Sequence, residues 1–143
     1  ILGLAVSVPY TLLQDKGKQL ERLAQMQSLA FISDMFNGRD ALLAIEKKAS
    51  EQDRRDAMMT AMLCLERAGE RLDVLDDIRN VPNYSHLRDI IHTSTLSLSN
   101  MILSGDETEL QIIVERITKI ADSIPPNDSS PERLYQALEQ LDL

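Results

Sequence analysis

The chain has few of the side chains that usually carry out catalysis or bind metals. Its 143 residues include one cysteine, two histidines, no tryptophan and only 3% aromatic residues. A single cysteine excludes a disulfide framework and a cysteine-based zinc site. It suits a reducing compartment, so we expect a cytoplasmic protein. The phosphate-binding motif GxxxxGK(S/T), the dinucleotide motif GxGxxG, the nucleophile motif GxSxG and the zinc motif HExxH are all missing. We therefore expect no enzymatic activity, no cofactor and no metal.

Positive charge is also scarce. The chain has 23 acidic and 15 basic residues and a formal net charge of −8. Basic pairs such as Lys47/Lys48 and Arg54/Arg55 have acidic residues within a few positions. Nucleic-acid binding normally needs a clustered basic face, so this distribution argues against a nucleic-acid partner.

Apolar residues make up 43% of the chain and recur at helical spacing. The spacing is cleanest in two segments, Met58 to Leu75 and Leu110 to Ile124. Strict alternation of apolar and polar residues occurs only from Thr93 to Ser99, which we interpret as helix because helical spacing continues on both sides. The sequence thus predicts an all-α protein, a helical bundle of five or six helices without a sheet, forming one domain over residues 1–143.

Local signals predict where several helices begin and end. We expect a first helix to start at Pro9, capped by Ser7 or Val8, with Gly17 as a point of weakness. The Asn37-Gly38 pair predicts a turn, followed by a short second helix. Residues 1–8 are apolar and too short to span a bilayer, so we expect an extended arm packed on the domain. A membrane contact is expected only if this arm is the end of a removed transmembrane segment.

The later boundaries have clearer signals. Ser50 predicts the start of a helix over residues 51–79, and Ser85 predicts the cap of the next helix, which is expected to end at Ser104-Gly105. Asp106 to Glu109 is expected to start the following helix. Residues 125–130 predict a loop before a short C-terminal helix, which is capped by Ser130 and Pro131.

The histidines raise one hypothesis about chemistry. On a helix, His86, Asp89 and His92 lie three residues apart and project from neighbouring positions. A di-iron bundle would need a second carboxylate-x-x-His motif, which the sequence lacks. Ser85-His86 followed by Leu87-Arg88 resembles the histidine box of sensor histidine kinases, although no acid follows His86 directly and no proline follows the arginine. That resemblance implies a signalling bundle of the phosphorelay type, with His86 or His92 as the phospho-acceptor.

The remaining patterns favour binding over chemistry. Met58, Met59 and Met62 predict an adaptable partner-binding surface, because methionine side chains fit many shapes. The Ser/Thr run from Thr93 to Ser99 predicts either close helix packing or a polar-lined pocket, which would suit a sensory bundle for small ligands. Our leading hypothesis is a non-catalytic protein–protein interaction domain, regulatory or scaffold in type and excised from a larger protein. Its partner is expected to be another protein, or itself as a homodimer.

Overall fold

The computed structural model describes residues 2–128 and 130–143, which fold into five α-helices. These are α1 (Leu2–Ile45), α2 (Glu51–Ile78), α3 (Tyr84–Ser104), α4 (Leu110–Ser123) and α5 (Pro131–Glu139). The described residues contain no strand. The prediction of an all-α helical bundle is confirmed.

The first helix differs most from the prediction. It is one continuous helix of 44 residues that begins at Leu2, so Pro9 does not start it and Gly17 does not break it. Residues 2–8 are helical, where we expected an extended arm; Ile1 lies outside the described residues. The predicted turn at Asn37-Gly38 is also wrong, because the helix continues through it to Ile45.

The close packing of α1 on α2 explains why a glycine lies inside α1. A Cβ atom added at Gly38 would lie 3.3 Å from Leu65 Cδ2 and 3.5 Å from Cys64 Cβ. Glycine weakens a helix by about 1 kcal/mol relative to alanine, but here its missing side chain lets the two helices approach. A residue interpreted as a turn signal is therefore a packing residue.

Most of the other predicted helix ends are present. Ser50 is the N-cap of α2, and its hydroxyl accepts a hydrogen bond from the Asp53 amide at 3.1 Å. Gly105 ends α3 in the left-handed conformation, with φ of 74°. Ser130 is the N-cap of α5, and Pro131 follows it.

Two predicted starts are wrong. The α3 helix is preceded by Asn83, not capped by Ser85. Asn83 is left-handed, with φ of 59°, and its side-chain amide donates to the Leu138 carbonyl at 2.8 Å, which ties the start of α3 to the end of α5. At the start of α4, Asp106 accepts from the Thr108 amide at 3.1 Å and so stabilises the preceding turn, while the cap position falls on Glu109.

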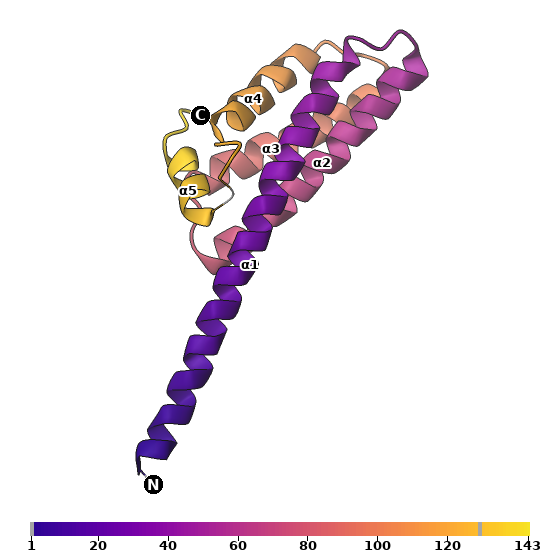
Figure 1. Cartoon of the computed structure of the whole chain (residues 1–143). Coiled ribbons are helices and arrows are strands. Elements are labelled where there is room, and N and C mark those ends of the chain that lie inside the picture. The colour runs from indigo at the N-terminus through magenta and orange to yellow at the C-terminus, as the bar shows by residue number, and fades with distance from the viewer. Residues whose placement is uncertain (1, 129) are drawn as a thin grey trace.

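The bundle is built around the pair α1 and α2, which run side by side in opposite directions (Figure 1). The α3 helix packs mainly on α2, α4 packs mainly on α1, and α5 lies across one end against α1 and α4. The core comes from one face of each helix and includes Phe31, Leu65, Leu98, Ile117 and Leu134. Both predicted seams, in α2 and α4, are buried in it.

The N-terminal half of α1 extends beyond the other helices (Figure 1). Within residues 2–128 and 130–143, no helix combines the length and apolar composition needed to cross a membrane.

Candidate interaction surface

The free part of α1 carries an exposed row of leucines. We call residues 12–23 of α1 the stem, and we call Leu12, Leu13, Leu20 and Leu23 the leucine stripe. Their exposed fractions are 57%, 68%, 49% and 37%, respectively. At about 100° per residue, all four project within one side of the helix. The stem therefore presents an apolar face that the described structure covers only in part, at Leu20 and Leu23.

This stripe continues the face that α1 buries inside the bundle. Leu13 and Leu20 are seven residues apart, and Ala24, Phe31 and Met35 follow at helical spacing. Phe31 and Met35 are fully buried. The change from exposed to buried thus reflects where the neighbouring helices end and not a change in the sequence pattern of α1.

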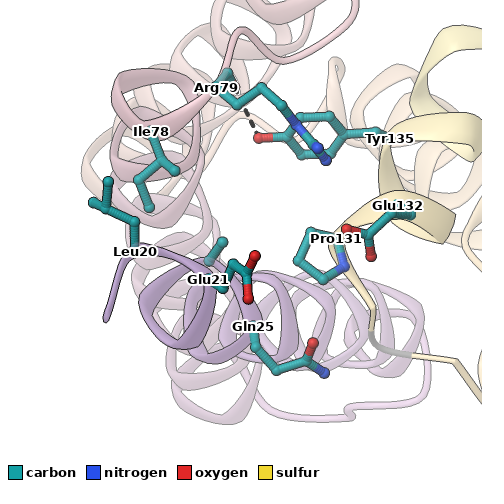
Figure 2. A pocket seen from close by; sticks show the side chains of 9 residues that line it. Leu20, Glu21, Gln25, Ile78, Arg79, Pro131, Glu132 and Tyr135 are labelled. Atoms are coloured by element: carbon teal, nitrogen blue, oxygen red, sulfur yellow. Dashed lines mark hydrogen bonds between the residues drawn. The ribbon is translucent and has the colours of Figure 1, made fainter. Parts of the chain in front are cut away.

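A groove lies at the base of the stem, where α1 meets the end of α2 and the start of α5 (Figure 2). We call it the basal groove. Its volume is about 400 Å³. Its lining includes leucine, isoleucine and proline together with charged side chains: Leu20, Glu21, Ala24, Gln25, Ile78, Arg79, Pro131, Glu132 and Tyr135. Leu20 belongs to both the stripe and the groove, so the two features form one continuous surface.

The wall formed by α2 and α5 is fixed by Tyr135. Its hydroxyl donates to the carbonyl of Arg79 at 2.8 Å. The Leu75 carbonyl, which also accepts from the Arg79 amide, lies 3.1 Å from the same hydroxyl. The Arg79 guanidinium lies 4.5 Å from the centre of the Tyr135 ring, a cation–π contact. Burial is the main reason that the pKa of Tyr135 is raised. These groups are engaged in holding α5 in place, so the wall is preformed.

The groove also carries negative charge. Glu21 from α1 and Glu132 from α5 both border the cavity (Figure 2). In the part of the chain that the structure describes, neither carboxylate forms an ion pair. The groove therefore suits a ligand segment that combines apolar and basic side chains.

The three methionines proposed as a binding surface do not form one exposed face. Met58 is buried in the core, Met62 is half-buried, and Met59 is 46% exposed. Met58 is committed to packing, because it belongs to the hydrophobic core. A partner surface on this helix would have to rest on Met59 and Met62, and that part of the hypothesis stays a prediction.

Both histidines lie on the exposed side of α3, as does Asp89. His92 borders an open hollow with Tyr84, Ser85 and Arg88, whereas His86 does not line it. Arg88 is held by Asp73 through two hydrogen bonds of 2.9 and 3.2 Å. Within the described ranges, no three metal-binding side chains come together. The phosphorelay hypothesis stays a prediction that rests on exposed imidazoles.

The Ser/Thr run is helical and serves partly in packing. Ser94 and Thr95 are buried, and the Thr95 hydroxyl donates to the His92 carbonyl at 2.8 Å. A groove of about 240 Å³ lies between α3 and α4. It is lined by hydroxyl groups, charged groups and isoleucine: Thr93, Ser94, Ser97, Glu109, Ile112, Ile113 and Arg116. The run thus takes part in helix packing and also borders a groove with polar side chains, so the two interpretations are compatible with each other.

The basal groove itself was missed by sequence reasoning. The helical spacing of Leu13 and Leu20 was visible, but it predicted only a helix. The meeting of Glu21, Arg79 and Tyr135 joins residues more than fifty positions apart and has no local signal. Comparison with known protein families, with curated proteins and with solved structures finds no match to this chain.

Proposed function

We propose that this chain is a non-catalytic interaction domain of the regulatory or scaffold type, and that it binds its partner through the leucine stripe and the basal groove. The observation that carries the proposal is the continuation of the buried face of α1 beyond the bundle as exposed leucines. Contiguous exposed apolar surface of this kind is typical of interaction sites. The partner is a helix that packs on the stem, on the side where α2 packs on the rest of α1.

The amount of exposed surface supports specific binding. The exposed fractions of the four leucines add up to about two whole leucine side chains. Burying one such side chain contributes roughly 1.5–3 kcal/mol, so the stripe can contribute about 3–6 kcal/mol. A matching stripe on the partner doubles this figure. The total is on the scale of the cost of association, about 4–15 kcal/mol, so a paired stripe can stabilise a complex whereas a single leucine cannot.

The charges of the groove describe the partner further. Glu21 and Glu132 border the cavity and are not engaged in ion pairs within the described residues. A partner helix that carries lysine or arginine beside its apolar side chains would complement them, which favours correct orientation and fast association.

The test is site-specific photo-crosslinking in cells that produce the chain. A benzophenone side chain at position 20 lies on the stripe. The control position is Leu103, which is 83% exposed but lies near the C-terminal end of α3, away from the stem. We expect a discrete crosslinked polypeptide from position 20 and none from position 103. Equal labelling at both positions, or none at position 20, would refute the proposal.

A second candidate function rests on the groove between α3 and α4, whose lining of Thr93, Ser94 and Ser97 suits a small polar ligand. A sensory bundle would bind such a ligand there. A thermal-shift screen of small metabolites tests this candidate. We expect a metabolite that binds in this groove to raise Tm in the wild type but not in Ser94→Val. A screen in which no metabolite raises Tm would refute this candidate function.

A further inference from the structure

We propose that the N-terminal end of α1 inserts into one leaflet of a lipid bilayer and holds the bundle at the membrane surface. We call residues 2–11 of α1 the apolar tip. The tip precedes the stem, so its lipid ligand is independent of the partner helix proposed for the leucine stripe.

The apolar tip lacks charge on every side of the helix. Residues 1–14 contain no charged residue. At about 100° per residue, the aliphatic positions of the tip are spread over about 200° of the helix circumference. These positions are Leu2, Leu4, Ala5, Val6 and Val8. A helix that packs on a protein surface has polar residues opposite its apolar face, as α4 has at the exposed Glu115 and Lys119. The composition of the tip is instead typical of a helix surrounded by lipid.

The length of the tip matches one leaflet. Ten helical residues extend about 15 Å, and the hydrocarbon core of a bilayer is about 30 Å thick, so the tip reaches about the midplane. Within the described residues no helix is suited to crossing a membrane, and this shallow insertion does not need one. The sequence alone predicted a membrane contact only for a cut transmembrane segment. Because α1 extends away from the other helices, the bundle does not obstruct the approach of the tip to a bilayer (Figure 1).

Pro9 supports a lipid environment. It lies inside α1, where its ring removes a backbone hydrogen bond. The other helices of the bundle do not reach this part of α1 and so cannot compensate for the loss (Figure 1). In lipid the helix is the only conformation in which a single segment satisfies its own backbone groups, and proline is more frequent in membrane helices than in soluble ones. Insertion thus accounts for an unbroken helix through Pro9.

Lys16 and Lys18 follow the tip near the level of the lipid head groups. They lie five and seven residues beyond Thr11, or about 8 and 11 Å along the helix, and their long side chains can reach back toward the phosphates. Basic side chains at this level are attracted to anionic phospholipids. Asp15 offsets one of the two charges, so residues 1–18 carry +1, whereas residues 19–143 carry −9. Most of this negative charge lies in the bundle, beyond the stem.

The first experiment is flotation of the full chain with vesicles of phosphatidylcholine and phosphatidylglycerol in equal parts, because bound protein floats whereas aggregated protein sinks. We expect the wild type to float and Val6→Asp to lower its partition coefficient about tenfold or more, since hydrocarbon disfavours a charge. Leu103→Asp places the same charge at an exposed leucine of α3 and should float like the wild type. A wild type that does not float, or an equal loss in both variants, overturns the proposal.

The lysines are tested in the same assay. Lys16→Gln and Lys18→Gln should each weaken binding to the mixed vesicles by about fivefold, and should leave binding to pure phosphatidylcholine unchanged. Unchanged binding to the mixed vesicles would place the lysines away from the head groups and overturn the proposed orientation.

The second experiment measures depth. The chain has no tryptophan, so a single introduced one reports its own surroundings. Val6→Trp, Leu20→Trp and Leu103→Trp are compared on vesicles whose acyl chains carry bromine, which quenches tryptophan fluorescence. We expect quenching in Val6→Trp alone. Equal quenching in Val6→Trp and Leu20→Trp would show a helix lying flat on the membrane and refute insertion.

Photo-crosslinking from position 6 separates a lipid from a protein ligand. In cells that produce the chain, we expect no discrete crosslinked polypeptide from a benzophenone at position 6, whether or not position 20 gives one. A discrete polypeptide at position 6, in a chain that does not float with vesicles, would show that protein covers the tip and would refute the lipid ligand. The result at position 20 tests the proposed function separately.

Discussion

Gly69 lies where α2 passes closest to the Arg88 side chain of α3, and replacing it with alanine tests how the two helices are held together. A Cβ atom there would lie 2.2 Å from Arg88 Nη1 and 2.8 Å from Cζ. The guanidinium would have to move away, and it would lose its two hydrogen bonds to Asp73. Tyr84 would keep its own hydrogen bond to Asp73.

Two opposing effects set the magnitude. Alanine is favoured over glycine inside a helix by about 1 kcal/mol. The side chains of the Asp73–Arg88 pair are 41% and 32% exposed, so losing the pair costs roughly 0.2–1 kcal/mol. We therefore expect Gly69→Ala to change the free energy of unfolding little in the wild type. In an Arg88→Ala background, where the obstacle is gone, it should stabilise by about 1 kcal/mol, or roughly 4 °C in Tm.

The assay is urea unfolding followed by far-UV circular dichroism, since the chain has no tryptophan to report by fluorescence. The four variants of the cycle are compared at constant protein concentration, because self-association would also shift the midpoint. Equal stabilisation by Gly69→Ala in both backgrounds would show that Arg88 does not occupy the space beside Gly69.

Three further predictions concern single positions. Asn83→Ala should lower the free energy of unfolding by about 2 kcal/mol, from the left-handed backbone and the lost hydrogen bond to Leu138, whereas Asn83→Gly should lose only about 1 kcal/mol. Phe31→Ala should cost about 3–5 kcal/mol, since Phe31 is fully buried, and a smaller loss in urea unfolding would contradict its place in the core. Burial, opposed by the charge of Arg71, raises the pKa of the Asp34 carboxyl above its ordinary 3.8. The Asp34 carboxyl therefore binds a proton more readily in the folded state than in the unfolded state. The free energy of unfolding falls as pH rises through the pKa of Asp34 in the folded state. Wild type should gain stability relative to Asp34→Asn as the pH is lowered from 7 to below 3.8; a difference that stays constant with pH would contradict this assignment.

Periodic apolar positions were sufficient to predict the helices whose faces are fully covered. The α4 seam from Leu110 to Ile124 is buried as expected, because every turn of that helix meets the core. The same reasoning did not show that the apolar pattern of α1 continues beyond the helices that pack on it. Burial depends on where other helices end, and that is a property of the assembled bundle.

Glycine and proline were the main source of error. At Gly38 the cost of glycine in a helix, about 1 kcal/mol, is offset by the packing of α2 against α1. Pro9 and Gly17 precede the part of α1 that the other helices cover, so no such packing offsets their cost. The candidate site was harder still. Arg79 and Tyr135 come together only because α5 folds back onto the end of α2, and no local spacing indicates that contact.

Because α1 is one unbroken helix, the number of its residues determines the direction in which the leucine stripe points. Since the stem and the buried face of α1 belong to one helix, inserting a single residue between Gln25 and Met26 would turn the stripe by about 100° relative to the bundle. An insertion of seven residues would return it to nearly the same side, within about 20°, while moving it roughly 10 Å further out. The length of α1 thus fixes both the direction and the distance of the leucine stripe relative to the bundle. A partner that contacts the stripe and the basal groove at once can therefore bind only when the stripe points in one particular direction.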